Sequence, residues 1–263
     1  MTFRPIGDTP SDHPMNLPGA IALVTGGGRG IGEAIARRLA AGGLRVVVSG
    51  RDVAALEAVA RAIGGVAIPA DLSDRDAATE LAAAVARDVG PVSVLVNNAG
   101  LAESAPLART DDGLWDRTMA LNVTAAFALC RAVMPDMAKR GDGRVVNLAS
   151  NAGLRGYAYT SAYCASKHAL VGLTRALAVE FARTGVTVNA VCPGFVDTEM
   201  GERAAANIAR ATGRDGREAL AALSPQRRLM TPEEVAHAVW SFLPHEARGL
   251  TGQCIALDGG QSA

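Results

Sequence analysis

The sequence has no excess of charge of either sign, because 26 basic residues balance 26 acidic ones. A chain without such an excess has no overall field to gather nucleic acid or an anionic membrane. No apolar run approaches the ~18 residues of a membrane-spanning helix, and the N-terminal stretch carries proline and polar residues where a secretory signal needs apolar ones. We therefore expect a soluble cytoplasmic protein with neither a nucleic-acid nor a membrane partner.

The cysteines and histidines form no recognisable ligand pattern. The sequence has four of each, and no two cysteines have C-x-x-C spacing. Scattered cysteines in a cytoplasmic protein are rarely paired or metal-bound. The cysteines are Cys130, Cys164, Cys192 and Cys254. The sequence thus predicts no metal site and no disulfide.

Lysine and tyrosine are scarce. Lys139 and Lys167 are the only lysines among the 26 basic residues, and the only tyrosines are Tyr157, Tyr159 and Tyr163. Because arginine supplies nearly all the positive charge, a lysine at 167 indicates a role for a compact ammonium, although a chance surface lysine is the alternative. Tyr163 and Lys167 are four residues apart, so they would share one face of a helix.

Six apolar runs of strand length alternate with longer stretches of helical period. Continuous runs rich in Val, Ile and Leu are typical of strands that helices cover on both faces. The runs cover residues 20–26, 45–50, 66–70, 92–97, 144–149 and 186–192. The pattern predicts an α/β fold with a doubly wound, Rossmann-type parallel sheet.

The predicted organisation is a single domain over residues 20–263, preceded by a disordered arm over residues 1–19. After the sixth predicted strand, residues 198–231 leave the alternation for a polar, Ala- and Arg-rich insertion of helical character. Ligands of open α/β sheets bind outside the carboxyl ends of the strands, so this insertion is a candidate substrate lid.

A glycine-rich turn, "VTGGGRGIGEAI", falls at the first strand–helix junction. Glycines let the backbone approach a pyrophosphate, and the helix N-terminus offers free N–H groups. Gly26, Gly30 and Gly32 fit the pattern T-G-x-x-x-G-x-G. They do not fit G-x-G-x-x-G, because Ile31 stands where the last glycine should be. The turn predicts a dinucleotide site.

The end of the second predicted strand indicates which dinucleotide binds. Gly50 takes the place of the acid that would bind the 2′-hydroxyl of NAD, and Arg51 follows. Arg51 could meet a 2′-phosphate bidentately, and Arg29 in the glycine turn could approach the same group. We therefore favour NADP over NAD. Asp52 argues for NAD unless it caps the next helix, and Arg51 could instead be a solvated loop residue.

At this point the sequence resembles the short-chain dehydrogenase/reductase family, from about residue 19 to the end. Five motifs occur in the family's order, which makes the resemblance specific although each motif alone is modest. They are "TGGGRGIG" (25–32), "NNAG" (97–100), "YCASK" (163–167), "CPGFVDT" (192–198) and "LDGG" (257–260). The resemblance implies an NAD(P)-dependent oxidoreductase.

The resemblance also implies a catalytic tetrad of Asn122, Ser150, Tyr163 and Lys167. The phenol of Tyr163 would exchange a proton with the substrate oxygen, and the Lys167 ammonium would lower the pKa of that phenol. Ser150, thirteen residues before Tyr163, would donate a hydrogen bond to the substrate oxygen. Asn122 would support a water-linked proton path to Lys167.

The remaining expected cofactor contacts come from the same resemblance. Residues 71 and 72 would contact the adenine, residues 98–100 would line the cleft, and Val196 and Thr198 would hold the nicotinamide carboxamide. The full predicted set is Gly26, Arg29, Gly30, Ile31, Gly32, Arg51, Asp71, Leu72, Asn98, Ala99, Gly100, Tyr163, Lys167, Pro193, Gly194, Val196 and Thr198.

We expect Tyr157, Tyr159 and Phe195 to shape the substrate pocket. Residues 201–230 of the insertion carry six arginines against three acids. This excess would suit a phosphorylated carrier such as an acyl-CoA or acyl-carrier thioester, although a solvated helix face is the alternative.

The leading hypothesis is an NADPH-dependent reductase of a 3-oxoacyl thioester. One alternative is an NAD(P)-linked dehydrogenase of a small alicyclic or aromatic alcohol, and another is a nucleotide-binding protein without catalysis. The family resemblance further implies a homotetramer.

Overall fold

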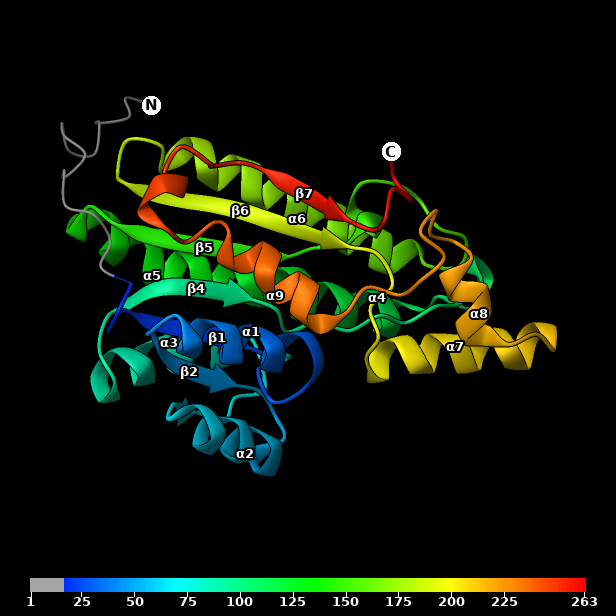
Figure 1. Cartoon of the computed structure of the whole chain (residues 1–263), viewed down its shortest axis with the longest axis horizontal. Coiled ribbons are helices and arrows are strands. Elements are labelled where there is room, and N and C mark those ends of the chain that lie inside the picture. The colour runs from blue at the N-terminus through cyan, green and yellow to red at the C-terminus, as the bar shows by residue number, and fades with distance from the viewer. Residues whose placement is uncertain (1–16) are drawn as a thin grey trace.

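Seven parallel strands form one sheet in the computed structural model, which describes residues 17–263, and helices cover both faces (Figure 1). The strand order is β3-β2-β1-β4-β5-β6-β7, so the chain crosses over between β3 and β4 to the other side of β1. The strands are β1 (Ile21–Thr25), β2 (Arg45–Ser49), β3 (Val66–Ala67), β4 (Val92–Asn97), β5 (Gly143–Leu148), β6 (Val186–Pro193) and β7 (Cys254–Leu257). The predicted doubly wound α/β sheet is confirmed.

Two strands differ from the sequence-based expectation. The third predicted run covers residues 66–70, but only Val66–Ala67 forms a strand. The second difference is β7, which is absent from the six predicted strands and pairs with the last residues of β6. Because Ile255 is 41% exposed, β7 lacks the fully buried apolar run that marks the central strands.

The helices lie between the strands in the expected alternation. Their starts have local causes: Asp52 Oδ1 accepts a hydrogen bond from Ala55 N at 3.1 Å at the start of α2, and Thr231 and Glu234 form a capping box at the start of α9. The helices are α1 (Gly30–Ala41), α2 (Val53–Ile63), α3 (Ala77–Asp88), α4 (Asp112–Met119), α5 (Ala125–Arg140), α6 (Ser161–Glu180), α7 (Glu199–Thr212), α8 (Gly216–Ala221) and α9 (Pro232–Trp240).

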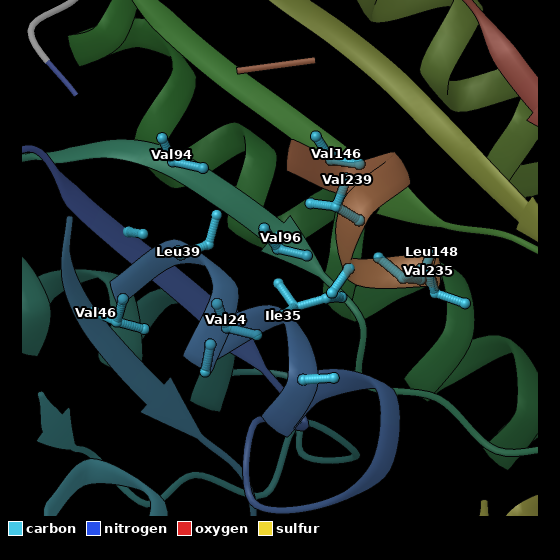
Figure 2. Packing of buried hydrophobic residues seen from close by; sticks show 14 of the residues in the cluster. Val24, Ile35, Leu39, Val46, Val94, Val96, Val146, Leu148, Val235 and Val239 are labelled. Carbon is cyan, nitrogen blue, oxygen red and sulfur yellow. The ribbon is translucent and has the colours of Figure 1, made fainter. Parts of the chain in front are cut away.

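Apolar side chains fill the space on both faces of the sheet. On one face Ile35 and Leu39 of α1 pack with Val235 and Val239 of α9 over the strands (Figure 2). Alternate strand residues such as Leu23 belong to the cluster on the other face, under α3 and α5. Each fully buried aliphatic side chain contributes roughly 1.5–3 kcal/mol. Two such layers hold the carboxyl ends of the strands in fixed positions.

Helices α4 and α5 are joined through a π-helical segment, Ala120–Thr124, into one long helix. By length and composition this helix, Asp112–Arg140, could cross a membrane, but half of its most apolar stretch is buried inside the protein. Core helices of soluble proteins pass the same test. Packing against the sheet therefore accounts for its apolar character, and the cytoplasmic location stays a prediction.

The N-terminal boundary lies slightly earlier than expected. Residues 1–16 are outside the described residues, so the predicted disorder of the arm stays a prediction. Leu17 packs against the core cluster, and Gly19 N donates a hydrogen bond to Gly43 O at 2.8 Å. The packed part of the chain thus includes the last three residues of the predicted arm.

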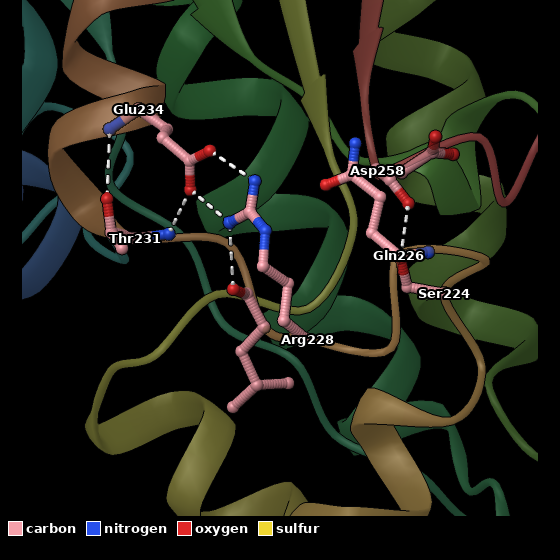
Figure 3. A network of polar contacts seen from close by, with 7 residues as sticks. Ser224, Gln226, Arg228, Thr231, Glu234 and Asp258 are labelled. Carbon is pink, nitrogen blue, oxygen red and sulfur yellow. Dashed lines mark hydrogen bonds and ion pairs between the residues drawn. The ribbon is translucent and has the colours of Figure 1, made fainter.

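The predicted insertion after β6 consists of α7 and α8. A polar network fixes its C-terminal end beside the end of β7 (Figure 3). Arg228 forms two hydrogen bonds with the Glu234 carboxylate, at 2.7 and 2.6 Å, and Ser224 Oγ donates to Asp258 O at 3.3 Å. Helix α7 itself has no buried residue. The helical character is confirmed, and the role as a lid stays a prediction.

Candidate active site

A cleft of about 420 Å³ lies at the carboxyl ends of the central strands. It falls between β1 and β4, where the strand order reverses, which is the usual ligand position in such sheets. All predicted cofactor residues line it except Gly194 and Val196. The Cα of Gly194 lies against Asp258, so that an added Cβ would be 2.9 Å from Asp258 Cβ, and Val196 is buried beside Met230.

The glycine turn is shaped by close contacts with its own backbone and with the end of β4. A Cβ on Gly32 would lie 2.0 Å from Gly26 O, so only glycine fits there. Asn98 Nδ2 donates to Thr25 O at 2.8 Å, and Thr25 Oγ1 accepts hydrogen bonds from Asn98 N and Ala99 N, both at 3.0 Å. The amide of Asn98 is thus used to hold the turn in place.

The Arg51 guanidinium follows the end of β2 and lines the cleft. Asp52 caps α2, as the NADP interpretation requires. Hydrogen bonds from Ser73 hold the pKa of the Asp71 carboxyl below its usual range, and the charge of Arg51 adds to that effect. Within residues 17–263, the Arg51 guanidinium makes no hydrogen bond or ion pair. It is free to receive an anion.

Arg29 has a partner that sequence spacing did not reveal. Its Nη1 lies 2.7 Å from Glu199 Oε2, at the first residue of α7. The other carboxylate oxygen of Glu199 pairs with Arg203 at 2.8 Å. Glu199, Met200 and Arg203 all line the cleft although none was predicted to do so. The insertion therefore reaches the dinucleotide site as well as the substrate side.

The structure selects one tyrosine of the three. Tyr163 lines the cleft, whereas Tyr157 and Tyr159 do not. Tyr163 and Lys167 lie on one side of α6, with Lys167 Nζ 5.7 Å from the centroid of the phenol ring. Lys167 Nζ also donates to Leu148 O at 2.7 Å, at the end of β5.

Burial dominates the titration of this pair. It raises the pKa of the Tyr163 phenol above its usual range, although a hydrogen bond with Ser150 lowers that pKa in part. It also lowers the pKa of Lys167 to about 8. Lost hydration thus outweighs the hydrogen bond that lowers the pKa of the phenol, and the expected effect of the Lys167 ammonium on that pKa stays a prediction. A phenol protonated at neutral pH suits the donation of a proton to a carbonyl oxygen.

Ser150 ends the segment that follows β5. It is 8% exposed, and its Oγ accepts a hydrogen bond from Ala152 N at 3.1 Å as the cap of a short 3₁₀ turn. The oxygen is therefore held in place, and its proton is within reach of Asn151 Oδ1 and Pro193 O, at 3.4 and 3.5 Å. A fixed donor of this kind can stabilise negative charge that develops on a substrate oxygen.

Asn122 lies in the π-helical segment between α4 and α5, a rare geometry that is frequent at functional sites. Its side chain exchanges two hydrogen bonds with the backbone of Leu101, at 2.9 and 3.0 Å, and donates to Ser166 Oγ at 3.0 Å. A Cβ on Gly100 would lie 3.1 Å from Asn122 Oδ1 and 3.7 Å from Lys167 Nζ. Asn122 thus positions the loop after β4 beside Lys167, and the water-linked proton path stays a prediction.

The predicted substrate residues fall into two groups. Tyr157 and Phe195 pack edge to face, with ring centroids 6.4 Å apart. The Tyr157 hydroxyl is buried without a normal hydrogen bond to the described residues. Tyr159 is 66% exposed, in a left-handed conformation with φ of 65°. Tyr159 is thus outside the aromatic wall that the other two form.

Sequence spacing also missed Asn151, which directly follows Ser150, and its hydrogen-bond partner Gln261. Asn151 Nδ2 donates to Gln261 Oε1 at 2.9 Å, which places the C-terminal segment beside the candidate catalytic serine. Arg155 donates a further hydrogen bond to Gln261 O. The only signal in the sequence is the position of Asn151 directly after Ser150, because its partner is 110 residues away.

A cleft at the switch point of a Rossmann-type sheet, with Ser150, Tyr163 and Lys167 at its end, defines an oxidoreductase that interconverts alcohols and ketones. A family model described as short chain dehydrogenase matches residues 20–209. The chain belongs to the short-chain dehydrogenase/reductase family.

Over nearly its full length the chain is similar to proteins whose names state an activity. The chain is 39% identical over 250 residues to a putative ketoacyl reductase of Streptomyces coelicolor, with 91% of this chain and 96% of the relative covered. It is 41% identical over 249 residues to galactitol 2-dehydrogenase (L-tagatose-forming) of Cereibacter sphaeroides, covering 93% and 95%. A crystal structure of a variant actinorhodin polyketide ketoreductase with NADPH superposes with a TM-score of 0.89 at 37% identity, covering 93% and 97%.

Proposed function

We propose that this protein reduces a ketone with NADPH, and that the ketone is a 3-oxoacyl thioester. The observation that carries the cofactor choice is the Arg51 guanidinium. It lines the cleft next to Gly50, where an acid would select NAD. It makes no hydrogen bond or ion pair within residues 17–263, although its charge acts on the Asp71 carboxyl. The actinorhodin polyketide ketoreductase variant, whose crystal structure is with NADPH, supports the same choice.

The substrate proposal rests on the ketoreductase relatives and not on charge. The arginine excess of residues 201–230 would favour a phosphorylated carrier, but acids just outside that range neutralise half of those arginines. Asp197 pairs with Arg217, Glu199 with Arg203, and Glu234 with Arg228. The insertion therefore has no unbalanced positive field to attract a carrier.

In the proposed mechanism, NADPH supplies the hydride and Tyr163 supplies the proton. The raised pKa keeps the Tyr163 phenol protonated until the substrate oxygen becomes basic. Ser150 donates a hydrogen bond to the same oxygen and stabilises its developing charge. Lys167, which is 5% exposed, anchors the end of β5 through Leu148 O and holds its positive charge beside the phenol.

The cofactor proposal is tested by replacing the free cation. We expect Arg51→Ala to weaken NADPH binding about tenfold or more, because a charge-assisted arginine–phosphate contact is lost, and to leave NADH binding nearly unchanged. The measurement is a fluorescence titration with each dinucleotide. Equal loss of affinity for both would contradict an NADP-specific role for Arg51.

The substrate proposal is tested by comparing turnover of acetoacetyl-CoA with that of a simple cyclic ketone, with NADPH in both assays. A higher kcat/KM for acetoacetyl-CoA is expected. The second candidate, a dehydrogenase of a small secondary alcohol, is favoured by the galactitol 2-dehydrogenase relative. It predicts oxidation of small alcohols and slow reduction of the thioester.

A further inference from the structure

We propose that Glu199 is a cofactor-selectivity residue: its carboxylate holds the Arg29 guanidinium and competes for it with the 2′-phosphate of NADP(H). This inference rests on the proposed use of NADP. It adds a residue from the insertion, outside every cofactor motif in the sequence, to the choice between the two dinucleotides.

The bridge connects the glycine turn to the insertion across the mouth of the cleft. Arg29 is the residue that precedes α1, and Glu199 is the first residue of α7. The two side chains are 170 positions apart in sequence and 2.7 Å apart in space. The residues next to them are also close, because a Cβ on Gly30 would lie 3.3 Å from Thr198 Cγ2. Both Arg29 and Glu199 line the cleft.

The ion pair between Arg29 and Glu199 is weak enough for a phosphate to replace the carboxylate. The Arg29 and Glu199 side chains are 62% and 51% exposed, and solvated ion pairs of this kind are weak. A phosphate accepts charge-assisted and often bidentate hydrogen bonds from arginine, which are stronger than a solvated pair. A bound phosphate can therefore replace the carboxylate as the partner of Arg29.

The competition affects the two dinucleotides differently. NADPH gains Arg29 only by displacing Glu199, whereas NADH lacks the 2′-phosphate and leaves the bridge intact. Arg203 shares the carboxylate and lines the cleft, and any effect that it has on the parts common to both dinucleotides cancels when the two affinities are compared. The ratio of the two affinities therefore isolates the role of Arg29.

The test is Glu199→Gln, with dissociation constants measured for NADPH and NADH without substrate. We expect the Kd for NADPH to fall about two- to fivefold, the size of a lost exposed ion pair, and the Kd for NADH to stay unchanged. Glu202→Gln is the matched control. It removes the same charge from the same turn of α7, where Glu202 makes no ion pair, so the affinity ratio should not change.

A second background separates the competing explanations. In Arg29→Ala, the Glu199→Gln change should no longer improve NADPH binding, because the contested cation is absent. If the improvement persists there, or if Glu199→Gln tightens NADH equally, the proposal is wrong. Arg51→Ala separates the two proposals, because Arg51 takes no part in the bridge. A wild type that prefers NADH and is insensitive to Arg51→Ala would overturn the cofactor proposal itself.

Discussion

Replacing Lys167 by methionine should make the protein more stable and inactive. The Lys167 ammonium is 5% exposed, and burial lowers its pKa from 10.5 to about 8. A shift of that size corresponds to a cost of roughly 3 kcal/mol for keeping the amine charged in the folded state. Loss of the hydrogen bond to Leu148 O offsets about 1 kcal/mol of this. Lys167→Met should therefore gain about 2 kcal/mol at pH 7.

The difference in stability between wild type and Lys167→Met should depend on pH. The unfolded chain keeps the proton on this amine up to pH 10.5, whereas the folded chain releases it near pH 8. The cost is therefore complete below pH 8 and disappears as the pH rises toward 10.5. Urea unfolding of wild type and Lys167→Met, without cofactor, at pH 7 and pH 9.5 measures the difference. A variant that is less stable at pH 7, or a difference independent of pH, would refute the assigned cost of burial.

Three further substitutions test the site, with Tyr159→Phe as the comparison for one of them. Tyr163→Phe should lower kcat by about 10²- to 10⁴-fold through loss of the proton donor, and should change the Kd for NADPH measured by titration far less; turnover near the wild-type level would contradict the mechanism. Gly32→Ala should abolish detectable dinucleotide binding in the same titration, because its Cβ would lie 2.0 Å from Gly26 O. Tyr157→Phe should leave the thermal midpoint unchanged or slightly higher, because its buried hydroxyl lacks a normal hydrogen bond. It should also change the ratio of KM values for two ketones, which Tyr159→Phe, at an exposed side chain, should affect less.

The parts of the fold that the sequence predicts are those with strong local signals. Buried strands such as Val92–Asn97 coincide with their apolar runs. The glycine turn and the Tyr163–Lys167 spacing carry their geometry in a few neighbouring residues. The short edge strand β7 escaped prediction because its side chains are only partly buried, and burial is what the pattern of apolar residues reports.

The parts that the sequence could not predict depend on contacts between distant segments. Nothing near Arg29 indicates that Glu199 will be its partner, and the same holds for Asn151 and Gln261. The raised pKa of Tyr163 was also missed, because spacing identifies the neighbouring lysine but not the degree of burial. The positive excess counted along residues 201–230 suggested a phosphate-attracting surface for the same reason. The acids that neutralise it lie outside the counted residues.

Chemical modification of the two lysines can report whether a dinucleotide occupies the cleft. Amines react with acylating reagents in their neutral form, and the lowered pKa of Lys167 increases the neutral fraction of this amine near neutral pH compared with an ordinary lysine. Lys139 is exposed on α5 and reports only the outer surface. A dinucleotide that fills the cleft would shield Lys167 and leave Lys139 unaffected. Peptide mapping after brief acylation would then follow binding with no introduced label.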